Sequence, residues 1–206
     1  MKTKFLLVII FLSAGIFAQE TPEKKVYHYD ALSLSAGANI SLIHDDYYTK
    51  QVPGVGGFLG FGYVPYQNDK FSVTSTLIYS YHQAFNELHS NNFNYQLNNK
   101  IHSLQIGGYM TFLRQKTFQP NAGFLAGFTL GNSYTFKIFE NSDLIYKDTS
   151  VRDDKFRSNI YFQGGFQIQL KPDIFLDINA FVPLIRESDK EFMTFFNLGV
   201  KYVWDM

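Results

Sequence analysis

Residues 156–171 read FRSNIYFQGGFQIQLK, and their side chains alternate between apolar and polar types. One face carries Phe162, Phe166, Ile168 and Leu170, and the other carries Asn159, Gln163, Gln167 and Gln169. A repeat of two residues is typical of a β-strand, because successive side chains of a strand point to opposite faces. The class of protein then depends on which of these two faces lies inside the molecule.

The same alternation recurs along most of the chain. Eight segments show it, at about residues 31–42, 54–66, 71–85, 100–113, 121–137, 156–170, 174–186 and 192–204. Several of them are longer than the strands of soluble sheets, which suits strands tilted across a bilayer. The connections are short after every second strand and longer and polar after the first, third and fifth, as in outer-membrane barrels. The sequence therefore predicts an all-β fold, an eight-stranded antiparallel up-and-down transmembrane β-barrel.

The polar faces of these segments hold mostly Ser, Thr, Asn, Gln, Gly and Tyr. A strand surface in contact with water is normally rich in Lys, Glu, Asp and Arg, whereas a narrow barrel fills its lumen with small and hydrogen-bonding side chains. We therefore expect the apolar face of residues 156–171 to contact lipid and the polar face to line a packed lumen. The alternative is a soluble, secreted, lipocalin-like barrel that binds a lipophile.

Composition limits the compartment and the partners. The chain has 206 residues, no Cys and a formal net charge of zero, so it lacks both Cys-based metal sites and the basic balance expected of a nucleic-acid partner. Residues 1–18 combine two early Lys residues, a short apolar run and small residues, which is typical of a secretory signal peptide. We expect a signal peptide at 1–18, a polar leader at 19–30 and the barrel at 31–206, located in the outer membrane of the cell envelope.

Few groups in the chain could carry out catalysis, and we expect no cofactor and no metal. His102 and Ser103 are adjacent on a strand, so they point to opposite faces, and His89 precedes Ser90 in a polar connection without an orienting acid. His82 is expected in the lumen. We therefore predict a protein that is not an enzyme, and the alternative is an outer-membrane enzyme that modifies the acyl chains of lipid A.

Two charged residues are expected to pair inside the barrel. A hairpin centred near Asp189 would put Asp177 opposite Lys201 on the polar face. A lone charge in a closed lumen would be costly, so we predict that this pair stabilises the barrel and has no catalytic role.

The long connections are the predicted working surface. They span about residues 43–53, 86–99 and 139–155 and carry aromatic residues that are candidates for partner contacts, namely Tyr47, Tyr48, Phe93, Tyr95 and Tyr146. Exposed aromatic side chains in loops are frequent binding residues. Besides outer-membrane lipid, another envelope or extracellular protein or a glycan would be the partner. The same residues could instead be anchors at the lipid interface.

The chain resembles the small PorT-like outer-membrane β-barrel family from about residue 30 to residue 206. The resemblance consists of the signal ending IFAQE and the strand sequences LSLSAGANIS, GVGGFLGFGY, FQPNAGFLAGF and NLGVKYVWD. It implies an exported, envelope-associated barrel, since related barrels serve protein secretion or adhesion, and it supplies no catalytic residue. The chain departs from the common pattern of outer-membrane barrels because it ends in YVWDM and not in Phe.

Overall fold

The computed structural model describes residues 30–45, 50–152, 158–184 and 191–205, which form nine strands. They are β1 (Ala31–Asp45), β2 (Lys50–Gln67), β3 (Phe71–Ser90), β4 (Phe93–Phe112), β5 (Phe118–Glu140), β6 (Asp143–Arg152), β7 (Ser158–Lys171), β8 (Ile174–Pro183) and β9 (Glu191–Asp205). No helix in these ranges is long and apolar enough to cross a membrane. The expected signal peptide, all of the expected leader except its last residue, and Tyr47 and Tyr48 lie outside the described residues.

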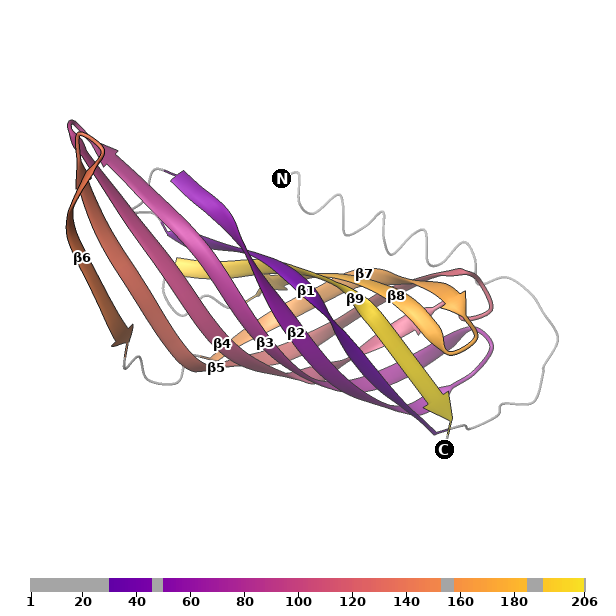
Figure 1. The fold of residues 1–206 in the computed structure, drawn as a ribbon. Helices are drawn as coiled ribbons and strands as arrows, with labels where there is room; N and C mark the ends of the chain where they lie inside the picture. The colour runs from indigo at the N-terminus through magenta and orange to yellow at the C-terminus, as the bar shows by residue number, and fades with distance from the viewer. Residues whose placement is uncertain (1–29, 46–49, 153–157, 185–190, 206) are drawn as a thin grey trace.

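Eight of the nine described strands close into a ring. Their order is β4-β3-β2-β1-β9-β8-β7-β5, and a pairing between β4 and β5 joins the two ends. Every pairing is antiparallel, and Figure 1 shows the tilted strands wrapping around a common axis. The predicted all-β, eight-stranded antiparallel barrel is thus confirmed. The ninth strand, β6, pairs with the end of β5 that runs beyond the ring.

The first and last strands complete the ring through a continuous register from Ala31 opposite Asp205 to Asp45 opposite Glu191. At one point the two backbones approach closely, where Gly37 faces Gly199. A Cβ atom on Gly199 would lie 2.5 Å from the carbonyl oxygen of Ala36 and 2.6 Å from the ring of Phe58. The seam of the barrel therefore needs glycine at this position.

The lumen is polar and the outer wall is apolar. Buried polar side chains point inward from every strand of the ring, among them Asn39, Ser41, Thr74, Ser80, Gln105, Asn121, Gln163, Gln167, Asn179 and Asn197. Large apolar side chains are exposed on the outside, among them Leu34, Ile40, Leu59, Phe61, Leu77, Ile106, Phe124, Val182, Leu198 and Val200. This arrangement is the reverse of a soluble barrel and fits a wall in contact with lipid.

An apolar layer crosses the lumen, a feature that the expected polar filling did not include. Its buried members are Phe58, Ile78, Leu125, Tyr161, Phe181 and Phe195. The rings of Phe181 and Phe195 stack with their centroids 4.4 Å apart, and the His82 ring lies 4.7 Å from that of Phe195. This layer fills the lumen around Phe195, which is fully buried.

Because the outer wall is apolar, a charged side chain on it should destabilise the barrel, by an amount that depends on its depth in the membrane. Leu198 is 53% exposed and lies between Ala38 and Ile178 on the neighbouring strands, in the middle of the apolar band. We expect Leu198→Arg to lower the free energy of unfolding in phospholipid vesicles by about 2–4 kcal/mol, because the cation would sit in hydrocarbon. Urea-dependent unfolding in vesicles measures this change.

The matched control is Phe118→Arg, at the turn end of β5, where an outward side chain is 49% exposed. Near the interface an added Arg costs only about 0–1 kcal/mol. Equal costs at the two positions would contradict the placement of the band.

Candidate functional site: a projection beyond the barrel

One part of the wall continues well past the rest of the ring. β5 pairs with β7 only as far as Phe128 opposite Ser158, and from Asn132 onward it pairs with β6. We call the sheet formed by residues 84–90 of β3, 93–99 of β4, 132–140 of β5 and all of β6 the projection. Figure 1 shows it at the upper left, beyond the ends of the other strands.

The projection corrects two predictions. Residues 86–99 and 139–155 were expected to be long loops, but strands run through most of both ranges, and the turns in their described part, which ends at residue 152, are at 91–92 and 141–142. Asn91, Asn141 and Ser142 have positive φ values of 51°, 48° and 78°, a conformation that Asn adopts more readily than most residues. The backbone N–H of Asn141 donates a hydrogen bond to the carbonyl oxygen of Asn92 at 3.1 Å, so the two hairpin tips are joined.

The face of the projection that continues the lumen is aromatic. Tyr95 stacks on Phe136 with ring centroids 6.2 Å apart, Phe93 lies 6.3 Å from Tyr95, and Tyr146 meets Phe136 edge-on at 6.4 Å. Leu97 and Ile138 share this face by register, since Leu97 is opposite Phe136 and Ile138 is opposite Tyr146. We call Phe93, Tyr95, Phe136 and Tyr146 the aromatic face.

Three of the five expected contact residues are therefore together, although on strands and not in loops. Phe93 and Tyr95 belong to β4 and Tyr146 belongs to β6. Phe136, which contacts both Tyr95 and Tyr146, was not among the expected residues. Its signal in the sequence was the alternation from Tyr134 to Ile138, which continues the apolar face of β5 past the ring.

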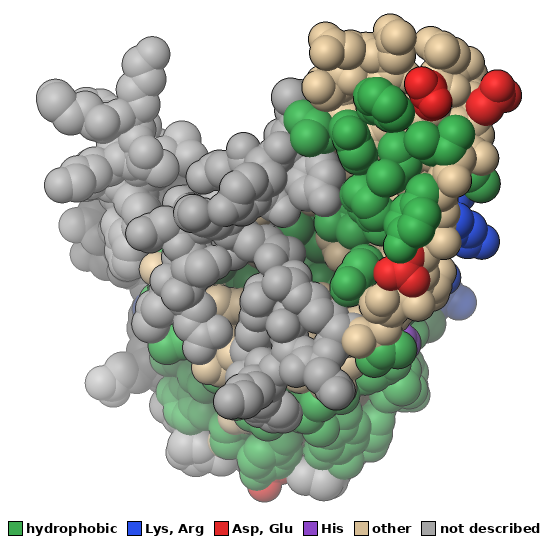
Figure 2. Space-filling model, turned by 90° about the vertical axis from the view of Figure 1, so that its left-hand side faces the viewer, with side chains coloured by type: hydrophobic (Ala, Val, Ile, Leu, Met, Phe, Trp, Pro, Cys, Tyr) green, Lys and Arg blue, Asp and Glu red, His purple; other side chains and the backbone are tan. Residues whose placement is uncertain are grey.

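β6 forms the free edge of the projection. Within the described ranges it pairs only with β5, and its other edge has no strand partner. Leu144, Ile145 and Tyr146 on this strand are 51%, 53% and 50% exposed. Figure 2 shows hydrophobic side chains gathered on one side of the upper right part of the molecule, which belongs to the projection. An exposed strand edge thus lies beside an exposed apolar surface.

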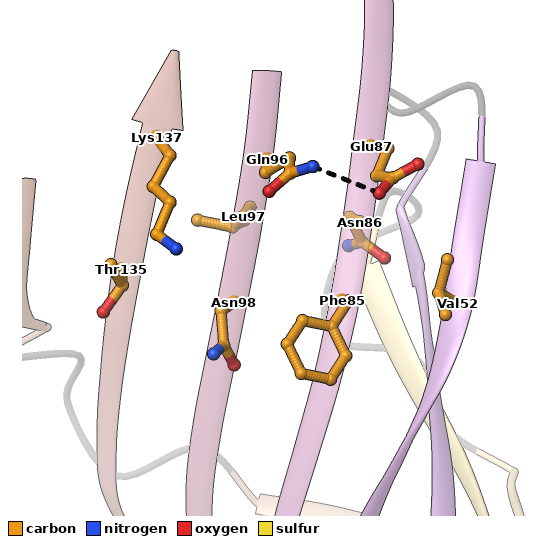
Figure 3. Close-up of a pocket in the computed structure, with 9 residues that line it drawn as sticks. All are labelled: Val52, Phe85, Asn86, Glu87, Gln96, Leu97, Asn98, Thr135 and Lys137. Atoms are coloured by element: carbon orange, nitrogen blue, oxygen red, sulfur yellow. Dashed lines mark hydrogen bonds between the residues drawn. The ribbon is translucent and has the colours of Figure 1, made fainter. Parts of the chain in front are cut away.

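A small pocket lies where the projection leaves the ring. It is lined by Val52, Phe85, Asn86, Glu87, Gln96, Leu97, Asn98, Thr135 and Lys137 (Figure 3). Gln96 Nε2 donates a hydrogen bond to Glu87 Oε1 at 3.4 Å, and Lys50 Nζ lies 3.4 Å from Glu87 Oε2. No group of three or more metal-ligating side chains occurs here or elsewhere in the described ranges.

The two charged residues expected to pair are both inside the barrel, but their register differs from the predicted one. Asp177 lies opposite Gly199, and Lys201 lies opposite Phe175, so the two charges are diagonal neighbours. Lys201 Nζ donates a hydrogen bond to the hydroxyl of Tyr109 at 2.8 Å, and Asn179 Nδ2 donates one to Asp177 Oδ2 at 2.8 Å. The prediction that Asp177 lies directly opposite Lys201 was therefore wrong, and the register differs from the predicted one by two residues.

The lumen also brings a histidine and a serine together. His82 Nε2 lies 3.2 Å from Ser103 Oγ, which accepts a hydrogen bond from Gln105 Nε2 at 2.7 Å. His82 and Ser103 are 1% and 5% exposed, and the other ring nitrogen of His82 has no hydrogen-bond partner among the described residues. His102 points outward from the neighbouring position, where its Nδ1 meets the hydroxyl of Tyr79 at 2.6 Å.

No protein-family model matches the sequence, and no curated protein matches it. The folds of several solved structures are similar to the fold of this chain. The crystal structure of Ail, the attachment invasion locus protein of Yersinia pestis, is 14% identical, covers 86% of this chain and 100% of its own, and has a TM-score of 0.51. The same protein in complex with the heparin analogue sucrose octasulfate gives the same identity and coverage and a TM-score of 0.53.

The outer membrane protein OprG from Pseudomonas aeruginosa is 12% identical, covers 89% of this chain and 100% of its own, and has a TM-score of 0.46. At these identities, the likeness to Ail concerns the fold alone. The chain has the fold of a small outer-membrane β-barrel, and the expected location in the outer membrane agrees with that fold and with the apolar outer wall.

Proposed function

We propose that this chain is a non-enzymatic, integral outer-membrane barrel of the cell envelope that binds another protein through its projection. The observation that carries the proposal is the aromatic face lying beside the unpaired edge of β6. Membership of the PorT-like family, with its association with secretion or adhesion, is part of the proposal and rests on the resemblance in sequence alone.

A protein partner suits this surface better than a glycan does. The free edge of β6 offers main-chain N–H and C=O groups to an extended segment, which could add to the sheet as a further strand. Tyr146 and Phe136 would then contact the side chains of that segment, and large aromatic residues are typical of the energetically dominant part of an interface. A glycan would use the aromatic rings but leave the strand edge unused.

The lumen supports a role without catalysis. His82 and Ser103 have the distance of a base and a nucleophile, but both are enclosed by the barrel wall and the apolar layer. No carboxylate holds the second ring nitrogen of His82 among the described residues, whereas a catalytic His normally has an orienting partner. We take the contact as part of the hydrogen-bonded filling of the lumen.

A photo-crosslinking amino acid at Tyr146, introduced in living cells, tests the binding proposal. We expect a discrete protein adduct at this position. Adding Phe136→Ala to the same chain should lower the yield of that adduct by about thirtyfold or more, because Phe136 supports both Tyr95 and Tyr146 and loss of a dominant interface residue costs about 2 kcal/mol or more. Gel mobility after affinity purification measures the yield.

The matched control places the crosslinker at Tyr202, a 47% exposed aromatic position on the outer wall near the opposite end. It should give no adduct of the same size. A product at Tyr146 that resists protease and yields to glycosidase would instead identify a glycan, and a complete lack of product would contradict the proposal.

A further inference from the structure

The outer face of the projection carries a different chemistry from the aromatic face. Alternation along β3 continues the outward positions Leu77 and Tyr79 of the barrel wall into Phe85 and Glu87 of the projection. Lys137 and Lys147 lie on this side of the projection by register, and Lys50 and Lys100 lie on the same outward side of the strands directly next to it. We call them the lysine face, and it is the direct extension of the wall that contacts lipid.

We propose that the lysine face binds the phosphate groups of anionic lipid headgroups in the outer leaflet and so holds the projection against the membrane surface. This inference goes beyond the proposed function, since it concerns the opposite face of the projection and a lipid instead of a protein.

The pairing of Lys137 with Lys147 is the first argument. These residues lie directly opposite each other on β5 and β6, and like charges in that position destabilise a sheet unless an anion lies between them. Glu87 is the carboxylate in the same row, but Lys50 and His89 already contact it at 3.4 and 3.7 Å, and Gln96 separates it from Lys137. Figure 3 shows Glu87, Gln96 and Lys137 on adjacent strands.

The remaining cations lack partners within the described part of the chain. Lys100, Lys137 and Lys147 make no ion pair there. Apart from Glu87, the acidic groups Glu140 and Asp148 of the projection lie on the aromatic face, because Glu140 shares the register of Phe93 and Asp148 that of Phe136. Figure 2 shows basic side chains at the right-hand edge of the projection, away from its hydrophobic side. The excess positive charge is thus confined to the outer face.

The height of the lysine face matches the headgroup region. Lys100 is two residues beyond His102, whose ring contacts Tyr79 and lies 5.1 Å from that of Tyr81 on the outer wall. Tyrosines on the outside of a barrel mark the membrane interface. Lys137 lies opposite Gln96 of β4. Gln96 is four residues beyond Lys100, which is about 13 Å along the tilted strand. Lysines at this height are attracted to an anionic membrane surface.

A lipid surface fits this face better than a single dissolved anion does. The lysines are spread over four strands and form no enclosed site, so each meets a different headgroup, as on a fluid membrane. They also continue a wall whose exposed apolar residues already require lipid.

Binding of diphosphorylated lipid A carrying a fluorescent acyl chain tests the inference, with the full barrel folded in zwitterionic detergent micelles and anisotropy as the readout. We expect the double variant Lys137→Gln/Lys147→Gln to bind about thirtyfold more weakly than the wild type, because it loses two headgroup contacts. The variant Lys137→Arg/Lys147→Arg should keep the affinity. The control Lys116→Gln/Lys171→Gln removes two exposed lysines at the turn end and should change nothing.

Three results would overturn the inference. One is equal affinity in the two glutamine variants. Another is equal binding of dephosphorylated lipid A, since acyl chains alone would then explain the affinity. The third is loss of binding on addition of inorganic phosphate at the same phosphate concentration, which would indicate a site for free anions. A heat-modifiable shift on a gel, present in every variant, shows that the barrel is folded.

Discussion

Replacing Phe195 with alanine will lower the free energy of unfolding by about 3–5 kcal/mol. Phe195 is fully buried and lies at the centre of the apolar layer, where it stacks on Phe181, meets Tyr161 edge-on with centroids 5.4 Å apart and packs against His82. The closed wall of the barrel cannot collapse around the missing ring, so the variant loses both the transfer free energy of the ring and the contacts across the cavity.

Phe196→Ala is the matched control for this prediction. The two residues are adjacent in β9, but Phe196 points outward and is 57% exposed to the surroundings of the barrel. Lipid chains fill the space left by an outward ring, so this variant loses the transfer free energy without a cavity. We expect its loss of stability to be less than half that of Phe195→Ala. Urea-dependent unfolding of both variants in the same vesicles measures the difference, and equal losses would show that the apolar layer does not stabilise the lumen.

Most of the barrel could be predicted from the sequence because alternation is a local property. In β7 the inward positions Gln163 and Gln167 are buried, and Leu170 on the other face is 56% exposed. The scarcity of charge on the inward face then determined which side met lipid. No long-range information was needed for either step, since each strand carries its own two faces.

The projection was missed because polarity was given more weight than periodicity. Residues 86–99 and 139–155 contain many Asn, Asp and Ser residues, as solvated loops do. Yet Phe93, Tyr95 and Leu97 alternate with polar residues, and the pairs Asn91-Asn92 and Asn141-Ser142 separate two alternating segments by two residues, the pattern of a tight hairpin. Polar composition is also what an exposed strand outside the membrane requires, so composition alone could not separate the two structures.

The register between β8 and β9 could not be predicted because it depends on the geometry of the connection between the two strands. A hairpin centred one residue differently moves every pair by two positions, which is the difference between the expected opposition of Asp177 to Lys201 and the observed opposition to Gly199. The shift preserves the face of both residues, since it is an even number. Both side chains therefore lie in the lumen as predicted, although their pairing differs from the predicted one.

Replacing Lys201 with methionine will also destabilise the barrel, by about 3–5 kcal/mol, because Asp177 would remain as an uncompensated buried charge. Asp177 and Lys201 are 7% and 5% exposed, and their nearest partners are neutral groups, Asn179 for the carboxylate and Tyr109 for the ammonium. Each charge is thus hydrogen-bonded, and within the described ranges the opposite charge that offsets it is the other member of the pair, at a diagonal position on the adjoining strand.

The double variant Asp177→Asn/Lys201→Met separates charge compensation from loss of individual hydrogen bonds. If the two charges stabilise each other, the double variant will lose less stability than the sum of Asp177→Asn and Lys201→Met, with a coupling free energy of about 1–3 kcal/mol. Strictly additive losses would mean that Lys201 acts only through Tyr109 and that the two charges are independent. The amide that replaces the carboxylate of Asp177 keeps its shape, so packing around Asn179 changes little and the coupling reports the charge itself.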